Sequence, residues 1–540
     1  MGSNAGLPDS KQAAPPAGLG RAAFLLSLAA LVIGFLGLRA YDAGLRQLLI
    51  HDEWITILLA SANLSNYWEI LGRLPQGAWI PIEAFDDLRS PADQHAYGQI
   101  YRDLVHQDIH PPLYFFTLHG WRAAFGDSLA AQYALNAVFS AATILAVAWL
   151  ALRITANRTA ALAAAALFAL SPLMSAPYQS ILRQYELLQL CVILSALGWT
   201  ALARDPRRRW AIAFVAAVAA QTAGLLTHIQ FVLVMAAAVG AAFLYPALRW
   251  RGAVLIAASA AGATAVFLLL HPELFAQVSR QQSLISDPAA SGALSRMVFY
   301  VTGFAEAFGL RGLITGQVSF FVALAALVAG FAALWILARR AAAQGRLSTG
   351  AGFVALLTLF TILAYSAQYL GHRAPEHSAG GRYFLLFWGL GAVTIAALIS
   401  TTSRRSFVGI TAVLVALCIA DTTLRLIQAP QRYAAEAAHL AAIAQSPLVY
   451  TDTARRGHSM PILANMSEGA QIYLGAGDTL EDFQRLLEGP NLPQLFVTTD
   501  LYVDDPDRIA RKRALVEDRF GDRLITFGNA RILYQRVRPE

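Results

Sequence analysis

The chain has 540 residues, of which 57% are hydrophobic and only 14% are charged. This composition is too apolar for a water-soluble globular protein, and it fits a polytopic membrane protein. The formal net charge is +7, and arginine carries nearly all of the positive charge, because lysine occurs only at Lys11 and Lys512. In a membrane protein an excess of positive charge indicates which loops face the cytoplasm. We therefore expect membrane lipids, and no nucleic acid, as partners.

Residues 1–20 are rich in Ala, Gly and Pro and predict a disordered cytoplasmic leader. We interpret the apolar run after Arg21 as an uncleaved anchor, since no small-residue cleavage site precedes Tyr41; a cleaved signal peptide is the alternative. A bilayer crossing needs about 20 apolar helical residues. Eleven segments meet this requirement, near residues 21–40, 129–151, 159–176, 183–203, 210–227, 228–248, 252–271, 313–338, 350–370, 383–401 and 407–425.

Arginine clusters orient these spans. They occupy every second short loop, namely Arg153 with Arg158, Arg204 with Arg207–Arg209, Arg249 with Arg251, Arg339 with Arg340 and Arg346, and Arg404 with Arg405. The positive-inside rule places these loops in the cytoplasm. The other loops and the tail after Gln428 then face outward. We therefore expect a multi-pass protein of a bacterial inner membrane, with its active site and its C-terminal domain on the periplasmic side.

The segment HPPLYFFTLHGWRAAFG, residues 110–126, would reverse this topology if it crossed the membrane. At about 1.5 Å per residue its apolar part spans about 22 Å, which is less than the roughly 30 Å of a bilayer core. We expect an interfacial helix there, within a first periplasmic loop at residues 41–128. The transmembrane domain then covers residues 21–428 with about eleven helices.

After residue 428 the composition becomes that of a soluble domain. Strands are predicted at 447–452, 470–476 and 494–500, a helix at 479–489, and a hairpin at 524–537. Strands that alternate with helices predict a small periplasmic α/β domain at residues 429–540. Acceptor recognition or covering of the active site would be its function.

Two adjacent acids, Asp52 and Glu53, open the first outer loop in the sequence HDEW. One interpretation is purely structural, because Asp52 suits the N-cap of the helix EWITILLASA. The functional interpretation is that two like charges at a partly dry boundary perturb each other, so that one of them acts as a base.

Two further outward segments carry cations and tyrosines at the mouth of a span. They are YQSILRQYELLQL (178–190), with Arg183, Tyr185 and Glu186, and GHRAPEHSAGGRYFLLFW (371–388), with His372, Arg373, His377, Arg382 and Tyr383. The positive-inside rule does not require arginine on the outer side. One alternative is that a single arginine near the membrane only extends its side chain to the surface. Arginines beside a carboxylate suit the binding of an anionic phosphate and the deprotonation of a hydroxyl.

Together these motifs resemble the GT-C superfamily of integral-membrane glycosyltransferases, close to the protein O-mannosyltransferase and aminoarabinose-transferase group. The resemblance covers roughly residues 20–400. It rests on HDEW, HPPLY, the block 167–190 and GRYFLLFWGLGA (381–392). The chain departs from the pattern at Ile181, where relatives often carry a glutamate two positions before the arginine, so no role of that carboxylate carries over.

The resemblance implies transfer of a hexose or pentose from a polyprenyl-phosphate donor to a hydroxyl of a lipid, glycan or protein at the periplasmic face, with inversion. It implies that Asp52 is the general base and that Glu53 orients Asp52 or the acceptor. The implied substrate contacts are His110, Arg183 and Arg382 for the donor phosphate, Tyr185 and Tyr383 in the pocket, and His51 and His372. No motif demands a cofactor, and a divalent cation at Asp52 and Glu53 stays open.

Two other functions are alternatives. A transporter or flippase of lipid-linked sugars would favour ionisable residues near the membrane midplane, where polar residues such as Gln221 and His228 are few. A non-catalytic partner of an envelope polysaccharide assembly system would tolerate substitution of both Asp52 and Glu53.

Overall fold

The structure is a computed structural model of the whole chain. It describes residues 19–46, 49, 51–75, 78–86, 97–175, 181–204, 210–285, 301–310, 317–370, 380–444, 448–450, 466–474, 480–481, 484, 496–500, 510–511, 514–515, 518, 524–527 and 531–534. Most of the expected leader, and most of the helix expected at 479–489, lie outside these residues.

The described part of the chain is an α-helical polytopic membrane protein. Eight of its helices are long and apolar enough to cross a bilayer: α1 (Arg21–Leu45), α7 (Leu129–Thr155), α10 (Tyr185–Arg204), α11 (Trp210–Thr227), α13 (Trp250–Leu270), α16 (Gln317–Ala343), α17 (Thr349–Leu370) and α19 (Arg404–Ala444). Shorter apolar helices occupy the other three expected segments: α8 (Arg158–Leu170), α12 (Phe231–Leu244) and α18 (Gly380–Ile399). The total of eleven crossings stays a prediction.

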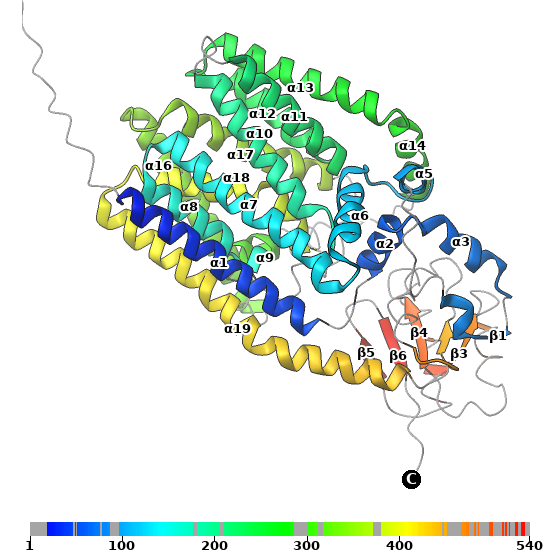
Figure 1. Cartoon of the computed structure of the whole chain (residues 1–540). Coiled ribbons are helices and arrows are strands. Elements are labelled where there is room, and N and C mark those ends of the chain that lie inside the picture. Colours follow the sequence, from blue (N-terminus) through cyan, green and yellow to red (C-terminus); the bar gives the residue numbers. More distant parts are fainter. Residues whose placement is uncertain are drawn as a thin grey trace, which may run out of the picture.

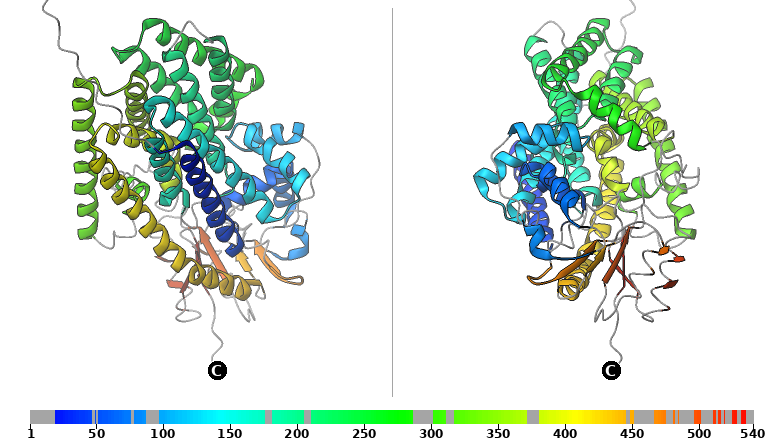
Figure 2. Two further views of the ribbon diagram at one scale, coloured as in Figure 1. Left: turned by 60° about the vertical axis from the view of Figure 1, so that its left-hand side comes forward. Right: turned by 90° about the vertical axis from the view of Figure 1, so that its right-hand side faces the viewer.

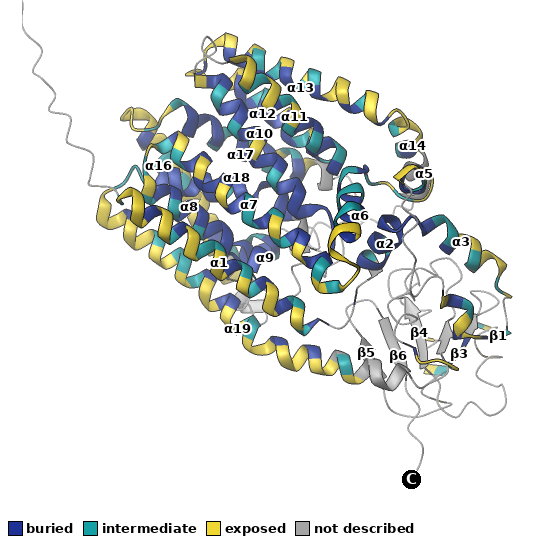
Figure 3. Cartoon of the chain, viewed as in Figure 1, coloured by how far each residue is buried: buried dark blue, intermediate teal, exposed yellow. Residues whose placement is uncertain are grey.

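The helices pack closely because small residues line their contacts. A Cβ on Gly198 of α10 would lie 2.8 Å from the Cβ of Ala217 in α11, so only glycine allows this approach. Helix α10 is the most buried candidate span, with 78% of its residues inside, against 22% for α19 and 11% for α16. Figure 3 shows the same contrast between buried central helices and the exposed faces of α1 and α19. The exposed apolar faces suit contact with lipid.

The first long loop folds into short elements: α2 (His51–Ala60), α3 (Leu64–Arg73), β1 (Ala78–Pro81), η1 (Ile82–Phe85), α5 (Tyr97–Gln107) and α6 (Leu113–Phe125). Side chains satisfy the open ends of these helices. Asp103 of α5 accepts from the N–H of Leu64, at 3.1 Å, and Nδ1 of His119 in α6 donates to the carbonyl of Ala60, at 2.8 Å. With 13 residues, α6 is not among the candidate spans.

Beyond α18, helix α19 continues through residue 428 to Ala444, so the boundary expected at 428 falls inside a helix. Two other connecting helices are α9 (Pro172–Ser175), next to α8, and α14 (Leu274–Ile285), after α13. Residues 301–307 are also helical. Figure 1 shows that α19 bends before it reaches the sheet, and Pro430 lies inside the helix, where it cannot donate a helical hydrogen bond.

The tail forms the expected strands and hairpin: β2 (Leu448–Tyr450), β3 (Gln471–Leu474), β4 (Phe496–Asp500), β5 (Leu524–Phe527) and β6 (Arg531–Tyr534). The sheet order is β1-β3-β2-β4-β6-β5, with β2 parallel to β3 and β4 and the other pairs antiparallel.

Strand β1 was not foreseen in this sheet, because it comes from the first long loop. Its register with β3 runs from Ala78 opposite Leu474 to Pro81 opposite Gln471. A further hydrogen bond, from the N–H of Gly469 to Glu83 (2.6 Å), reinforces the junction. The first loop and the tail therefore form one structural unit.

The sheet and the short helices of the first loop lie at the same end of the bundle (Figures 1 and 2). At the other end, the hydroxyl of Ser348 donates to the carbonyl of Ile154 at 2.5 Å, and Arg158 donates to the carbonyl of Leu19 at 3.3 Å. Arginine-rich turns thus meet at one end, and the motif residues of α2, α6 and α10 meet at the other. Which end faces the cytoplasm stays a prediction.

Candidate functional site

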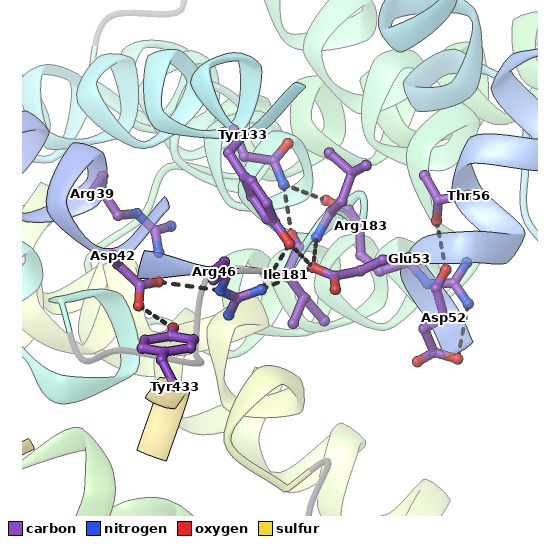
Figure 4. A network of polar contacts seen from close by, with 12 residues as sticks. Arg39, Asp42, Arg46, Asp52, Glu53, Thr56, Tyr133, Ile181, Arg183 and Tyr433 are labelled. Carbon is purple, nitrogen blue, oxygen red and sulfur yellow. Dashed lines mark hydrogen bonds and ion pairs between the residues drawn. The ribbon is translucent and has the colours of Figure 1, made fainter. Parts of the chain in front are cut away.

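Helix α2 presents the two adjacent acids in its first turn, where carboxylates interact favourably with the helix dipole. Consecutive side chains on a helix point in directions about 100° apart. Figure 4 shows Asp52 and Glu53 diverging accordingly. Asp52 pairs with Arg183, Oδ1 to Nη2 at 3.1 Å, and its side chain is 26% exposed, whereas that of Glu53 is fully buried.

Glu53 is held by a set of buried donors. Its Oε1 accepts from Nη1 of Arg46 at 3.1 Å and from the hydroxyl of Tyr133 at 2.6 Å. It also accepts from the backbone N–H of Leu182 at 2.8 Å. A buried carboxylate needs such charge and hydrogen-bond compensation. The two acids expected to perturb each other are therefore each paired with a different arginine.

The residues just before α10 lie outside the helix, and side chains fix their backbone. Asn136 of α7 donates to the carbonyls of Ile181 (2.8 Å) and Arg183 (3.1 Å). Tyr114 of α6 in turn donates to Oδ1 of Asn136 at 3.0 Å. Ile181, where the family pattern has an acid, contributes its carbonyl instead. The backbone of Arg183 is thereby anchored beside Asp52.

His110 is oriented by a residue that the sequence did not single out. Oδ1 of Asp108 accepts from the N–H groups of Ile109 (2.5 Å) and His110 (2.9 Å), and it contacts Nδ1 of the His110 ring. Burial alone would raise the pKa of Asp108, but the charge and hydrogen bond of His110, together with the charge of Arg183, lower it to about 2. Asp108 is thus an ionised partner that fixes the His110 ring.

His228, between α11 and α12, brings two predicted residues together. Its ring centroid lies 5.7 Å from that of His110 and 6.0 Å from that of Tyr185. Tyr185 is buried at the start of α10, two residues after Arg183. The described site therefore joins Asp52, Arg183, Asp108, His110, His228 and Tyr185, which come from four separate parts of the chain.

Some predicted residues cannot be placed at this site. His372 lies outside the described residues. His51 begins α2, and Arg382 and Tyr383 lie in the first turn of α18, but the described structure does not include the side chains of these three residues. Their roles stay predictions.

The described side chains include hydrogen-bond donors that could bind an anion and a carboxylate that could accept a proton. Among the described residues, no group of three or more His, Cys, Asp or Glu has an arrangement that could hold a metal ion. Asp52 and Glu53 each contact their own arginine, and a divalent cation held by both acids stays a prediction. The guanidinium group of an arginine that pairs with a carboxylate can exchange this partner for another anion, such as a phosphate.

Sequence reasoning missed Arg46, Asp108, Tyr133 and Asn136. A signal existed for three of them. Asp108 lies two residues before His110, close enough for a local hydrogen bond to its ring. Tyr133 and Asn136 are three residues apart on an otherwise apolar helix and so share a face. Arg46, at the end of α1, carries no comparable pattern.

Comparison with solved structures identifies the fold. The chain resembles ArnT from Cupriavidus metallidurans bound to undecaprenyl phosphate, with a TM-score of 0.51, 11% identity and coverage of 96% of this chain and 99% of that chain. The apo state of ArnT gives a TM-score of 0.50, with 12% identity and coverage of 94% and 97%. The archaeal oligosaccharyltransferase AglB from Archaeoglobus fulgidus gives a TM-score of only 0.45 at 12% identity, over 92% of this chain and 71% of that chain.

The similarity to ArnT extends over nearly the whole of both chains, so the GT-C-like fold expected from the motifs is confirmed. No family model matches the sequence, and no curated protein matches it either. At these low identities the likeness concerns the fold, and the chemistry has to be argued from the site itself.

Proposed function

We propose that this protein transfers a sugar from a polyprenyl-phosphate-linked donor to an acceptor hydroxyl at the periplasmic face of a bacterial inner membrane. The observation that carries the proposal is the contact between Asp52 and Arg183 at 3.1 Å, beside His110 and its ionised partner Asp108. A base and a phosphate-binding cation lie next to each other at one end of the helical bundle. The fold of ArnT, which was solved with undecaprenyl phosphate, supports this choice of donor.

In the proposed reaction Asp52 removes the proton from the acceptor hydroxyl. The hydroxyl oxygen then forms a bond to the anomeric carbon of the sugar, and the bond from this carbon to the phosphate oxygen breaks. The electron pair of the broken bond stays on the polyprenyl phosphate. A single displacement of this kind inverts the anomeric configuration, and one carboxylate is enough for it.

Arg183 stabilises the charge that develops on the departing phosphate. Its planar guanidinium can donate two parallel hydrogen bonds to phosphate oxygens, which an amine cannot do. His110 is the proposed second donor in its doubly protonated form, in which Nδ1–H faces Asp108 and Nε2–H can donate to the ligand. The predicted contacts from Arg382 and Tyr383 would complete this shell.

Arg183 and Asp52 neutralise each other in the ligand-free protein, which keeps two partly buried charges compensated. A donor phosphate would take over Arg183 and leave Asp52 to the acceptor hydroxyl. In this way binding of the donor precedes activation of the acceptor, and the base is released from Arg183 only when the donor is bound.

Asp52→Asn should abolish transfer while the protein still inserts and purifies normally, since asparagine keeps the shape of the side chain but cannot accept a proton as a base. The measurement is the level of lipid-linked sugars, by mass spectrometry, in a deletion strain that carries the wild-type or the variant gene. We expect the wild type to clear an accumulated intermediate and Asp52→Asn to leave it.

Asp127→Asn is the matched control, because it also weakens an aspartate–arginine pair in the first loop, with Arg122 at 3.0 Å. It should clear the intermediate as the wild type does. Full activity of Asp52→Asn would remove Asp52 as the base. Lack of any lipid-linked intermediate in the deletion strain would favour a non-catalytic function.

A further inference from the structure

The last transmembrane helix contributes a residue to the buried network next to the site. The hydroxyl of Tyr433 in α19 donates to Oδ1 of Asp42 in α1 at 2.5 Å. Oδ2 of the same carboxylate faces Nε of Arg46 at 3.5 Å. Figure 4 shows this row of side chains running from α19 across α1 toward α2.

Arg46 joins this row to Glu53. It contacts carboxylates on both sides, Asp42 through Nε and Glu53 through Nη1, and it also donates to Tyr133 at 2.8 Å. Only 4% of Asp42, 5% of Tyr433 and 9% of Arg46 is exposed. In such a dry environment each hydrogen bond to a charged group matters more than it would in water, and its loss is not replaced by solvent.

The row ends at the backbone that carries Arg183. Glu53 accepts from the N–H of Leu182 at 2.8 Å, and the next residue, Arg183, holds Asp52 at 3.1 Å. The described contacts are therefore continuous from the hydroxyl of Tyr433 to the pair that we assign to chemistry. They cross four elements: α19, α1, α2 and the segment before α10.

We propose that Tyr433 and Asp42 are positioning residues that act through Arg46 and Glu53 on the orientation of Arg183. The inference rests on the proposed function, because it concerns how well Arg183 meets a lipid-linked phosphate. Tyr433 lies three residues after Pro430, on the part of α19 that has bent toward the sheet (Figure 1). The helix that enters the C-terminal domain thus sets the geometry of the phosphate site.

The physical reason lies in how Arg46 divides its contacts between two acids. With the Tyr433 hydroxyl in place, one oxygen of Asp42 is satisfied by a neutral donor, and Arg46 remains available to Glu53. Without the hydroxyl, Asp42 draws Arg46 toward itself. The contact between Glu53 and Arg46 then weakens, and the hydrogen bond from the N–H of Leu182 to Glu53 loosens. As a result, Arg183 is less well oriented for a phosphate.

The test measures the affinity of the full-length protein in nanodiscs for undecaprenyl phosphate. Tyr433→Phe removes one oxygen atom and keeps the packing of the ring, so the variant is expected to fold. A tenfold change in affinity corresponds to about 1.4 kcal/mol, which is no more than the loss of one hydrogen bond to a charged group could cause. We expect Tyr433→Phe to weaken binding by about tenfold. Asp42→Asn removes the charge that competes with Glu53 for Arg46, so it should not weaken binding.

Arg432→Ala is the matched control on the same helix. It removes an exposed contact with Gln428, at 3.0 Å, one residue away from Tyr433, and should bind the probe as the wild type does. The second background is Arg183→Lys, which keeps the positive charge and so keeps binding measurable. If Tyr433 acts through the orientation of Arg183, Tyr433→Phe should have little further effect in that background.

Three results would overturn the inference in distinguishable ways. Wild-type affinity in Tyr433→Phe refutes the positioning role and leaves the proposed function standing. An equal loss in the native and the Arg183→Lys backgrounds shows a structural effect that does not pass through Arg183. Absence of binding by the wild type refutes the proposed donor, and the inference fails with it.

Discussion

Two neighbouring carboxylates of α2 experience very different surroundings. Glu53 is fully buried and meets an arginine, a tyrosine and a backbone N–H, which suits a residue that holds structure. Asp52 is partly exposed and meets Arg183 at the edge of the same network. Residues that bind an incoming charged group must be reachable, and this difference is why we propose Asp52 for the chemistry and Glu53 for positioning.

Asp108 gives a pH-dependent prediction at the scale of one residue. Its pKa is about 2 in the folded protein, below the ordinary value of 3.8 for an aspartate, because His110 and Arg183 outweigh the effect of burial. A lowered pKa stabilises the fold at pH values above the unfolded pKa, and that stabilisation is lost as the pH falls toward the folded value. The contribution is about 2 kcal/mol at neutral pH.

Asp108→Asn should therefore lower the free energy of unfolding by about 2 kcal/mol at pH 7, and by less as the pH falls from about 4 toward 2. The measurement is unfolding of the detergent-solubilised wild type and variant over this pH range. A difference that stays constant with pH would show that the ionised carboxylate does not stabilise the fold through His110.

At the scale of elements, the junction between β1 and β3 has a direct chemical test. Trp79 and Tyr473 are opposite each other in the antiparallel register, so cysteines at both positions should form a disulfide under mild oxidation. Trp79→Cys combined with Leu474→Cys is one residue out of register. Positions shifted by one residue along a strand lie on opposite faces of a sheet, so this control pair should not cross-link.

The readout is a mobility shift on a non-reducing gel. The two native cysteines, Cys191 and Cys418, are free and buried in the bundle and should stay inert. Cross-linking of both engineered pairs, or of neither, would contradict the register and with it the union of the first loop with the tail.

Long apolar elements were predictable because a membrane span has a fixed length. The expected segments at 129–151 and 183–203 correspond to α7 and α10. Strand β1 was not predictable in its sheet: four residues carry little pattern, and their partner lies almost 400 positions later in the chain. The continuation of α19 past residue 428 was hidden by Pro430, which in a sequence usually indicates the end of a helix.

At the candidate site, the sequence motifs identified several of the residues, but only the packing of the helices showed which residues they contact. Asp52, Arg183, His110 and Tyr185 follow from polar groups at the ends of spans, and the described structure brings them together. Arg46, Asp42 and Tyr433 could not be assigned to the site in this way. Asp42 and Arg46 are four residues apart and suggest a local ion pair, but nothing in the sequence links them to Glu53 or to Tyr433. Their pairing depends on how α1 and α19 pack, which the sequence alone does not reveal.

The whole molecule has two chemically different ends. The turns that contain Arg158 and Ser348 lie at one end, where they contact Leu19 and Ile154. The short helices of the first loop and the sheet lie at the other end (Figure 1). A polyprenyl-linked substrate keeps its tail in the lipid and presents its phosphate at the surface of the bilayer. The second end is where such a head group would meet Arg183 and where an acceptor bound to the sheet would approach Asp52.

The most direct measurement is a structure of the full-length protein determined with undecaprenyl phosphate. We predict that the phosphate lies against Arg183 and His110, and that the contact between Arg183 and Asp52 has opened. A phosphate bound elsewhere, with Arg183 still paired to Asp52, would contradict the proposed mechanism.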